Sequence, residues 1–280
     1  MRRHHRCIPI HKRLCMVLAL SFLCLSCATV PYTGRKSLNL VSDAEMVSLS
    51  LQQYAQVMKE AKLSGNARDV RMVKDVGQRI ASASETFLRE TGRGADIQSF
   101  QWEFNLIDDA ETVNAWCMPG GKVAVYTGLL PLTKDETGLA VVMGHEIAHA
   151  LARHGNERMS ETLLVQLGGM GLALALSQKP KATQDLFLAL YGISSQVGFM
   201  LPYSRLHEAE ADRIGLMLMA RAGYDPREAV ALWERMAAQG GSRPPQFLST
   251  HPAPESRIAN LKALIPEVMP YYHKGSGGIK

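Results

Sequence analysis

Cysteine is scarce in this 280-residue sequence, which contains only five. Cys7, Cys15 and Cys24 lie near the N-terminus, Cys27 follows them, and Cys117 stands alone in the rest of the chain. A structural disulfide is therefore not expected. The chain also lacks an internal repeat or a low-complexity linker that would divide it, so a single main domain is expected.

Long apolar runs are missing too. The run at residues 14–25 is too short for a membrane span, which needs about 20 residues. It follows a basic stretch and ends at Ser26-Cys27, which is typical of a cleaved signal. We predict a lipoprotein-type signal peptide at residues 1–26, lipidation of Cys27 and a tether at 27–41, although Cys24 stands where leucine is usual. Ordinary cleavage, giving a soluble periplasmic protein, is the alternative.

A surplus of positive charge is absent outside the signal. Of the 31 lysines and arginines, five lie in residues 1–26, so the remainder equals the 26 acidic residues. The net charge of +5 therefore belongs to the targeting segment. No nucleic acid partner is expected.

Two histidines and a glutamate stand together in HEIAH, residues 145–149. On an α-helix, residues i and i+4 lie one turn apart on one face, so His145 and His149 can bind one metal ion. Glu146 can then face the open coordination position and take a proton from a bound water. The motif predicts a catalytic zinc site; a chance match on a polar helix face is the alternative.

A helix is expected across this motif. Thr133, Lys134 and Asp135 offer a start, and apolar residues recur at helical spacing up to Leu151. Gly144 is unfavourable in a helix by roughly 1 kcal/mol against alanine. Its place beside His145 therefore indicates close packing or room for the metal.

A third ligand is expected on a second helix, in the sequence SRLHEAEAD that begins at Ser204. Glu208 and Asp212 are four residues apart on one face, whereas Glu210 points roughly 200° away. We expect Glu208 to bind zinc. Asp212 would accept a hydrogen bond from the free ring nitrogen of a ligand histidine. A solvated acidic helix face is the alternative.

These motifs, HEIAH, then SRLHEAEADRIG and then STHPAPESRI, resemble the CaaX-prenyl-protease-like (Ste/HtpX-type) family of gluzincin zinc metallopeptidases. The resemblance is to its bacterial periplasmic branch, which includes outer-membrane lipoproteins and a protease of β-barrel assembly. It implies that Glu208 binds zinc and that Asp212 orients a ligand histidine, as the helix-face argument also indicates.

His251 lies in the THP segment of the third motif. In the β-barrel-associated relative, a histidine in the matching segment resembles a fourth zinc ligand that keeps the enzyme latent. We hypothesise the same role for His251, since a ligand in the open position displaces the nucleophilic water. The alternative is a helix cap before a helix near Pro254. Arg257, on that helix, is expected at the surface, with an oxyanion-stabilising role as the alternative.

The expected fold is α+β, a mainly helical zincin-like metallopeptidase domain at residues 42–270 with a small sheet beside the HExxH helix. Helices are predicted at 42–62 and 67–91, strands between residues 100 and 126, and helices beyond residue 129. Residues 271–280 are expected to form a flexible tail.

The strand at Asn114, Ala115 and Trp116 is a candidate for binding an extended peptide by main-chain hydrogen bonds. The family's NAxxxPGG element carries this assignment, and a purely structural hairpin is the alternative.

These observations predict a zinc-dependent endopeptidase with one zinc per chain that degrades misfolded or misassembled envelope proteins. It would lie in the periplasm, anchored to the outer membrane through lipidated Cys27. Its expected partners are unfolded polypeptides and the outer-membrane assembly machinery. An assembly chaperone with little or no proteolysis is the alternative.

Overall fold

The computed structural model describes residues 27–167, 181, 183–186, 203–239, 246–251 and 256–275. The predicted signal peptide, residues 1–26, and residues 276–280 of the predicted tail lie outside these described residues.

Two N-terminal helices begin after polar residues that cap them. Helix α2 (Asp43–Glu60) starts after Ser42, whose side chain accepts a hydrogen bond from the amide of Glu45. Helix α3 (Ala67–Glu90) starts after Asn66, whose side chain accepts from the amides of Arg68 and Asp69. Both helices confirm the predictions within two residues of their ends.

A three-stranded sheet follows, formed by β3 (Glu103–Ile107), β4 (Ala115–Met118) and β5 (Lys122–Tyr126). The strand order is β3-β5-β4; β5 is parallel to β3 and antiparallel to β4. The predicted hairpin is β4–β5, and it turns through Gly120 and Gly121 with φ values of +87° and +84°. Side chains rarely adopt such angles, so glycine suits both positions. Strand β4 is left as an edge.

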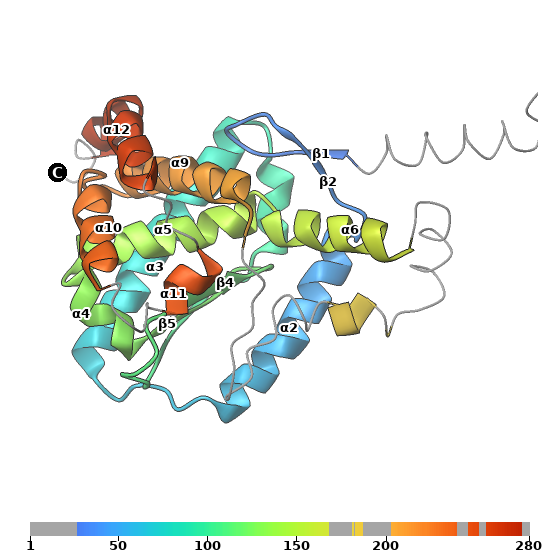
Figure 1. Ribbon diagram of the computed structural model, residues 1–280, viewed down its shortest axis with the longest axis horizontal. Helices are drawn as coiled ribbons and strands as arrows, with labels where there is room; N and C mark the ends of the chain where they lie inside the picture. The colour runs from blue at the N-terminus through green and yellow to red at the C-terminus, as the bar shows by residue number, and fades with distance from the viewer. Residues whose placement is uncertain are drawn as a thin grey trace, which may run out of the picture.

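The chain then becomes helical, as predicted. Helix α5 (Glu136–Leu151), capped by Asp135, lies between the sheet and helix α9 (Arg205–Arg221) (Figure 1). The other described helices are α4 (Leu130–Thr133), α6 (His154–Leu167), α10 (Glu228–Ala238), α11 (Gln246–Thr250) and α12 (Ser256–Gly275), and two short 3-10 turns span Gly94–Ser99 and Thr127–Leu129. The main core is formed by α3, α5, α9, α10 and the sheet.

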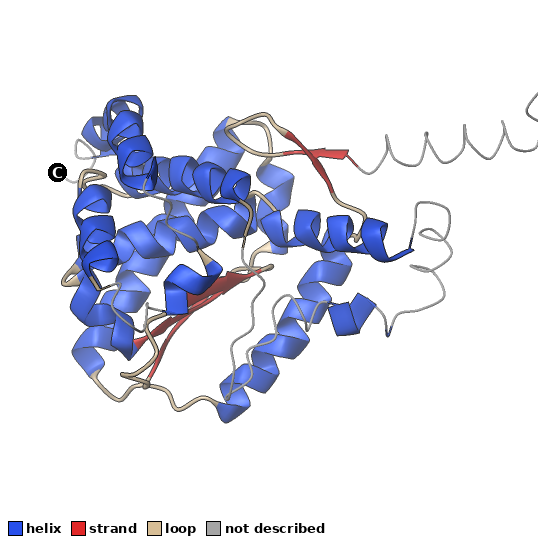
Figure 2. Ribbon diagram, in the orientation of Figure 1, coloured by secondary structure: helices blue, strands red, loops and turns tan. Residues whose placement is uncertain are grey.

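Residues 27–41 form an ordered hairpin against this core. Strand β1 (Cys27–Thr29) pairs antiparallel with β2 (Lys36–Leu38) (Figure 2). Val30, in the connection, is 2% exposed and belongs to the main core. The interpretation of these residues as a tether did not anticipate this packing. Acylation of Cys27 stays a prediction.

The C-terminal helix is longer than expected. Helix α12 continues to Gly275, so residues 271–275 are helical and not the start of a flexible tail. Among the described residues, no helix combines the length and the apolar character needed to cross a membrane. The two described layers, helices over a small sheet, give the predicted α+β fold.

Candidate metal centre

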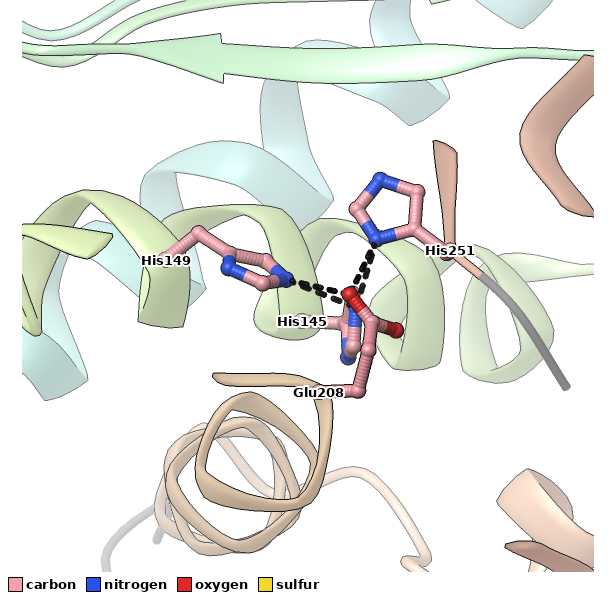
Figure 3. A group of neighbouring side chains, drawn as sticks. All are labelled: His145, His149, Glu208 and His251. Atoms are coloured by element: carbon pink, nitrogen blue, oxygen red, sulfur yellow. Dashed lines mark hydrogen bonds and ion pairs between the residues drawn. The ribbon is translucent and has the colours of Figure 1, made fainter. Parts of the chain in front are cut away.

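Four side chains from two helices and one loop converge beside the sheet (Figure 3). Helix α5 supplies His145 and His149 from adjacent turns of one face, and α9 supplies Glu208 from its first turn. His251 follows directly after α11. All four residues are buried, with at most 4% of each exposed.

The ligand atoms have the spacing of a tetrahedral site. The Nε2 atom of His145 lies 3.0 Å from Nε2 of His149 and 3.2 Å from Nδ1 of His251. The Oε1 atom of Glu208 lies 2.9 Å from Nδ1 of His251 and 3.3 Å from Nε2 of His149. Ligands about 2.0–2.1 Å from a tetrahedral zinc ion lie about 3.3 Å apart, so the donor set fits zinc.

The packing of these atoms also favours a cation between them. Three ring nitrogens face one another around His145 Nε2, and one carboxylate oxygen joins them. Once deprotonated, imidazoles that turn their lone pairs toward each other repel, and burial removes the water that would separate them, so a proton or a metal ion has to lie between these atoms. A metal ion accepts all of these lone pairs at once.

Asp212 occupies the predicted place behind His145. Its Oδ1 lies 2.9 Å from Nδ1 of His145, on the side of the ring opposite Nε2. Burial lowers the pKa of His145, but hydrogen bonds to Asp212 and Glu208 outweigh it and raise the pKa to about 9. The carboxylate of Asp212 is thus well suited to hold a proton on Nδ1 of His145. This leaves Nε2 of the same ring as the metal ligand.

Arg257 is buried, so its expected surface position is wrong. It is 3% exposed and donates to Oε2 of Glu208 at 2.7 Å and to Oδ1 of Asp212 at 2.6 Å. Its guanidinium carbon lies 3.5 Å from the ring centroid of Trp233. A guanidinium compensates two buried carboxylates at once, and it fixes Oε2 of Glu208, which lies 3.5 Å from Nε2 of His145.

Glu146 lies beside the four ligands. It is 3% exposed, and its Oε1 has no hydrogen-bond partner among the described residues, although Nε2 of His251 approaches to 3.3 Å. Burial raises the pKa of Glu146 above its ordinary value. A carboxylate with a raised pKa is a stronger base, which suits it to accept a proton.

A second group of side chains lies behind His149 and was missed by the sequence analysis. Nδ1 of His154 lies 2.9 Å from Nδ1 of His149, and Nε2 of His154 lies 3.0 Å from Oε2 of Glu210. Burial lowers the pKa of His154 to about 4, so this ring is neutral at pH 7. Tyr203 stacks on His149 with ring centroids 4.0 Å apart. The only signal in the sequence was a histidine five residues after the HExxH motif.

The candidate peptide-binding strand lies against the HExxH helix as the edge strand β4. Asn114, Ala115 and Trp116 have buried side chains, and the carbonyl of Asn114 accepts from the amide of Tyr126 in β5. Backbone groups alternate in an antiparallel pair, so those of Ala115 and Cys117 point away from β5. The carbonyl of the preceding Val113 accepts from the amide of Phe247 in α11.

The sequence profile described as peptidase family M48 matches residues 74–265. The mitochondrial metalloendopeptidase OMA1 of Schizosaccharomyces pombe is 36% identical over 243 residues, which cover 85% of this chain and 66% of that protein. The mitochondrial metalloendopeptidase OMA1 of Homo sapiens is 32% identical over 247 residues, which cover 85% of this chain and 46% of that protein. The beta-barrel assembly-enhancing protease of Escherichia coli is 28% identical over 251 residues, which cover 88% of this chain and 49% of that protein. The chain spans less than two thirds of each relative.

These relatives correct the predicted location. Six relatives with 31–38% identity are named as mitochondrial proteins, whereas the β-barrel-associated relative reaches 28%. The predicted periplasmic location with anchoring to the outer membrane is therefore wrong. The bacterial periplasmic branch named in the sequence analysis is not confirmed.

The coarser part of the predicted resemblance is confirmed. The profile match extends from α3 into α12 and includes all four candidate ligands, and the relatives are named metalloendopeptidases. The expected zinc cofactor agrees with this match and with the ligand spacing. The chain belongs to peptidase family M48.

Proposed function

We propose that this chain is a zinc-dependent endopeptidase that hydrolyses polypeptides bound in an extended form. The observation that carries the proposal is the convergence of His145, His149 and Glu208 with a buried carboxylate oxygen of Glu146 beside them that accepts no hydrogen bond from the described residues. A structural zinc site needs no such base. The relatives named metalloendopeptidases support the same reaction class.

His145, His149 and Glu208 would hold the ion. A bound zinc ion supplies a Lewis acid for the scissile carbonyl and lowers the pKa of its water. Glu146 accepts the proton from the attacking water and passes it to the leaving amine. Asp212 holds Nδ1 of His145 in its protonated tautomer, and Arg257 holds the second oxygen of Glu208.

The edge strand β4 would bind the substrate. An extended peptide can pair with the outward-facing backbone groups of Ala115 and Cys117, next to α5. This mode reads the main chain and not a side-chain sequence, so unfolded segments are preferred over folded ones. The backbones of Asn114 and Trp116 pair with strand β5 and hold the edge strand in place. Their role therefore differs from that of Ala115, whose backbone would bind the substrate.

His251 would act as a latch. Its Nδ1 lies among the ligand atoms, 2.9 Å from Glu208 and 3.2 Å from His145. A catalytic zinc needs a free position for water, so a fourth protein ligand keeps the enzyme inactive. Hydrolysis requires His251 to leave.

Helix α11 would block the substrate edge at the same time. Phe247, four residues before His251, donates its amide to Val113 at the start of β4 and stacks its ring on His251 at 4.5 Å. The amide of Tyr203 donates to Thr250 in the same segment. One displacement of residues 246–251 therefore frees both the metal position and the strand edge.

The test compares the zinc-loaded chain with Glu146→Gln on casein, with zinc content measured for both. We expect equal zinc content and a fall in turnover of about 10²- to 10⁴-fold, the usual contribution of a general base. Equal and measurable turnover of the two proteins, in the wild-type or in the His251→Ala background, would reject Glu146 as the base.

A client-binding role without proteolysis is the second candidate, and the filled fourth position at His251 is the observation that favours it. A protein that is inert even as His251→Ala, but still binds zinc and suppresses aggregation of an unfolded client, would support this role. Turnover of casein by wild type, lost in Glu146→Gln, would reject it as the sole function.

A further inference from the structure

The N-terminal hairpin reaches the metal centre through a line of polar side chains that begins partly buried and ends fully buried. Thr33 and Arg35 lie in the connection between β1 and β2, far in sequence from the HExxH helix. Both contact Glu210 of α9. Glu210 contacts His154, and His154 contacts the candidate ligand His149.

The direction of each hydrogen bond follows from the orientation of His149. Its Nε2 faces the other ligand atoms, so Nδ1 carries the proton when Nε2 binds zinc. Nδ1 of His149 then donates to Nδ1 of His154 at 2.9 Å. Nε2 of His154 in turn donates to Oε2 of Glu210 at 3.0 Å. His154 is 0% exposed, so water does not replace either bond.

Arg35 fixes the carboxylate at the end of this line. Its Nε and one terminal nitrogen donate to Oε2 of Glu210 at 2.8 Å and 2.7 Å, and Thr33 donates to the other oxygen. Arg35 also donates two bonds of 2.6 Å to Glu157 of α6. The guanidinium therefore joins α6 and α9 in a geometry that lysine cannot reproduce.

The same pair of helices is joined a second time. Nε2 of His207 in α9 lies 3.2 Å from Oε2 of Glu157, and the rings of His154 and His207 stack with centroids 4.5 Å apart.

The carboxylate of Glu210 is stabilised in its charged form. Its burial opposes ionisation, but hydrogen bonds from His154, Arg35 and Thr33 outweigh burial and lower the pKa of Glu210 to about 2. Glu210 is thus a charged acceptor at neutral pH.

The two candidate ligand histidines have matching support from α9. His145 bonds Asp212 directly, whereas His149 reaches Glu210 through His154. Such outer partners fix the tautomer and direction of a ligand histidine, and their loss typically weakens metal binding about 10- to 100-fold.

We propose that the N-terminal hairpin is a working part of the metal centre, in which Arg35 is a positioning residue that holds Glu210 and, through His154, sets the orientation of His149 for zinc. The proposal rests on the assignment of His149 as a ligand. It makes the segment before α2 a determinant of zinc affinity, and not only a connection to the rest of the chain.

The test measures the zinc dissociation constant by competition with a chromogenic chelator, for the full chain carrying Arg35→Met, Glu210→Gln or His154→Gln. We expect each variant to bind zinc about 10-fold or more weakly. Arg93→Met is the matched control, because Arg93 also bonds the hairpin, at the carbonyl of Thr29, and the other partner of its side chain among the described residues is Asp96 and not Glu210 or His154. Its zinc affinity should stay within about threefold of wild type while its melting temperature falls.

A double-variant cycle separates positioning from general stability. Arg35→Met and Glu210→Gln act on one line of contacts, so together they should weaken zinc binding little more than either alone. The cobalt-substituted Arg35→Met protein should show a shifted visible absorption band, which reports the ligand arrangement directly. Unchanged zinc affinity and an unchanged cobalt spectrum in a folded Arg35→Met variant would overturn the proposal.

Two further variants keep the result decisive. If Arg35→Met does not fold, Thr33→Val removes one bond to Glu210 with little change of volume, and zinc binding unchanged in that variant would overturn the proposal. His149→Ala tests the underlying assignment. Full zinc affinity in His149→Ala would reject the ligand set of the proposed function, whereas weak binding there with no effect of Arg35 would reject the hairpin's role alone.

Discussion

Gly144 of α5 and Gly215 of α9 face each other where the two helices cross. A Cβ atom added to Gly215 would lie 2.9 Å from both the carbonyl carbon of Gly144 and the amide nitrogen of His145. A Cβ atom on Gly144 would lie 3.0 Å from the carbonyl oxygen of Gly215. This close approach brings Glu208 of α9 within reach of both histidines of α5. Of the two interpretations of Gly144, close packing or room for the metal, it supports close packing.

Gly215→Ala should therefore weaken the metal centre without touching a ligand. The helices must separate to admit the methyl group, because the neighbouring atoms are backbone atoms, and overpacking of this kind costs about 1–3 kcal/mol of unfolding free energy. We expect a lower melting temperature and weaker zinc binding, both measured by titration and thermal melts. Gly65→Ala is the control, since its added Cβ has nothing within 4 Å. Equal stability and zinc affinity for wild type and Gly215→Ala would contradict this reading of the crossing.

Asp212→Asn should lower zinc affinity by about 10- to 100-fold, because the neutral amide holds Nδ1 of His145 more weakly. It also leaves Arg257 with one carboxylate partner instead of two. Chelator competition measures the change. Asp225→Asn, at an acid that pairs with exposed Arg227, should leave zinc affinity unaltered. An Asp212→Asn protein that binds zinc as tightly as wild type would show that this carboxylate does not support the ligand.

Zinc binding should release a proton at neutral pH. In the metal-free protein, hydrogen bonds to Asp212 and Glu208 outweigh burial and raise the pKa of His145 to about 9, so the ring is protonated at pH 7. Zinc must displace that proton, and apparent affinity should rise about tenfold per pH unit up to about pH 9, then level off. Calorimetry at pH 7.5 in two buffers of different ionisation enthalpy counts the proton. Zinc affinity independent of pH between 6.5 and 8.5 would contradict this protonation state.

The core of the candidate site could be predicted because its information is local. His145 and His149 are one helical turn apart, and Glu208 and Asp212 share a face of the next motif, so helix geometry places them. Three other features also depend only on neighbouring residues. They are the helix cap at Ser42, the helix that starts after Ser204 and the glycine turn between β4 and β5.

The missed residues depend on contacts between distant segments. Arg35 meets Glu210 across 175 positions and Glu157 across 122, which no spacing rule encodes. Glu210 does point away from the face of Glu208, but α9 is buried on both sides, because α6 and the N-terminal hairpin cover the second face. Arg257 was expected at the surface for the same reason, since its two carboxylate partners lie on another helix.

The most direct test of the account is casein hydrolysis by the zinc-loaded chain, His251→Ala, Glu146→Gln and the double variant. A latch that holds by about 1.4 kcal/mol leaves roughly one molecule in ten open, so His251→Ala should raise turnover by about tenfold or more. The double variant should be inert with zinc still bound, because Glu146 accepts the proton in the open enzyme as well. A latent zinc endopeptidase gives this result. Turnover in His251→Ala that is unchanged or lower than in wild type, or activity that survives in the double variant, would contradict it.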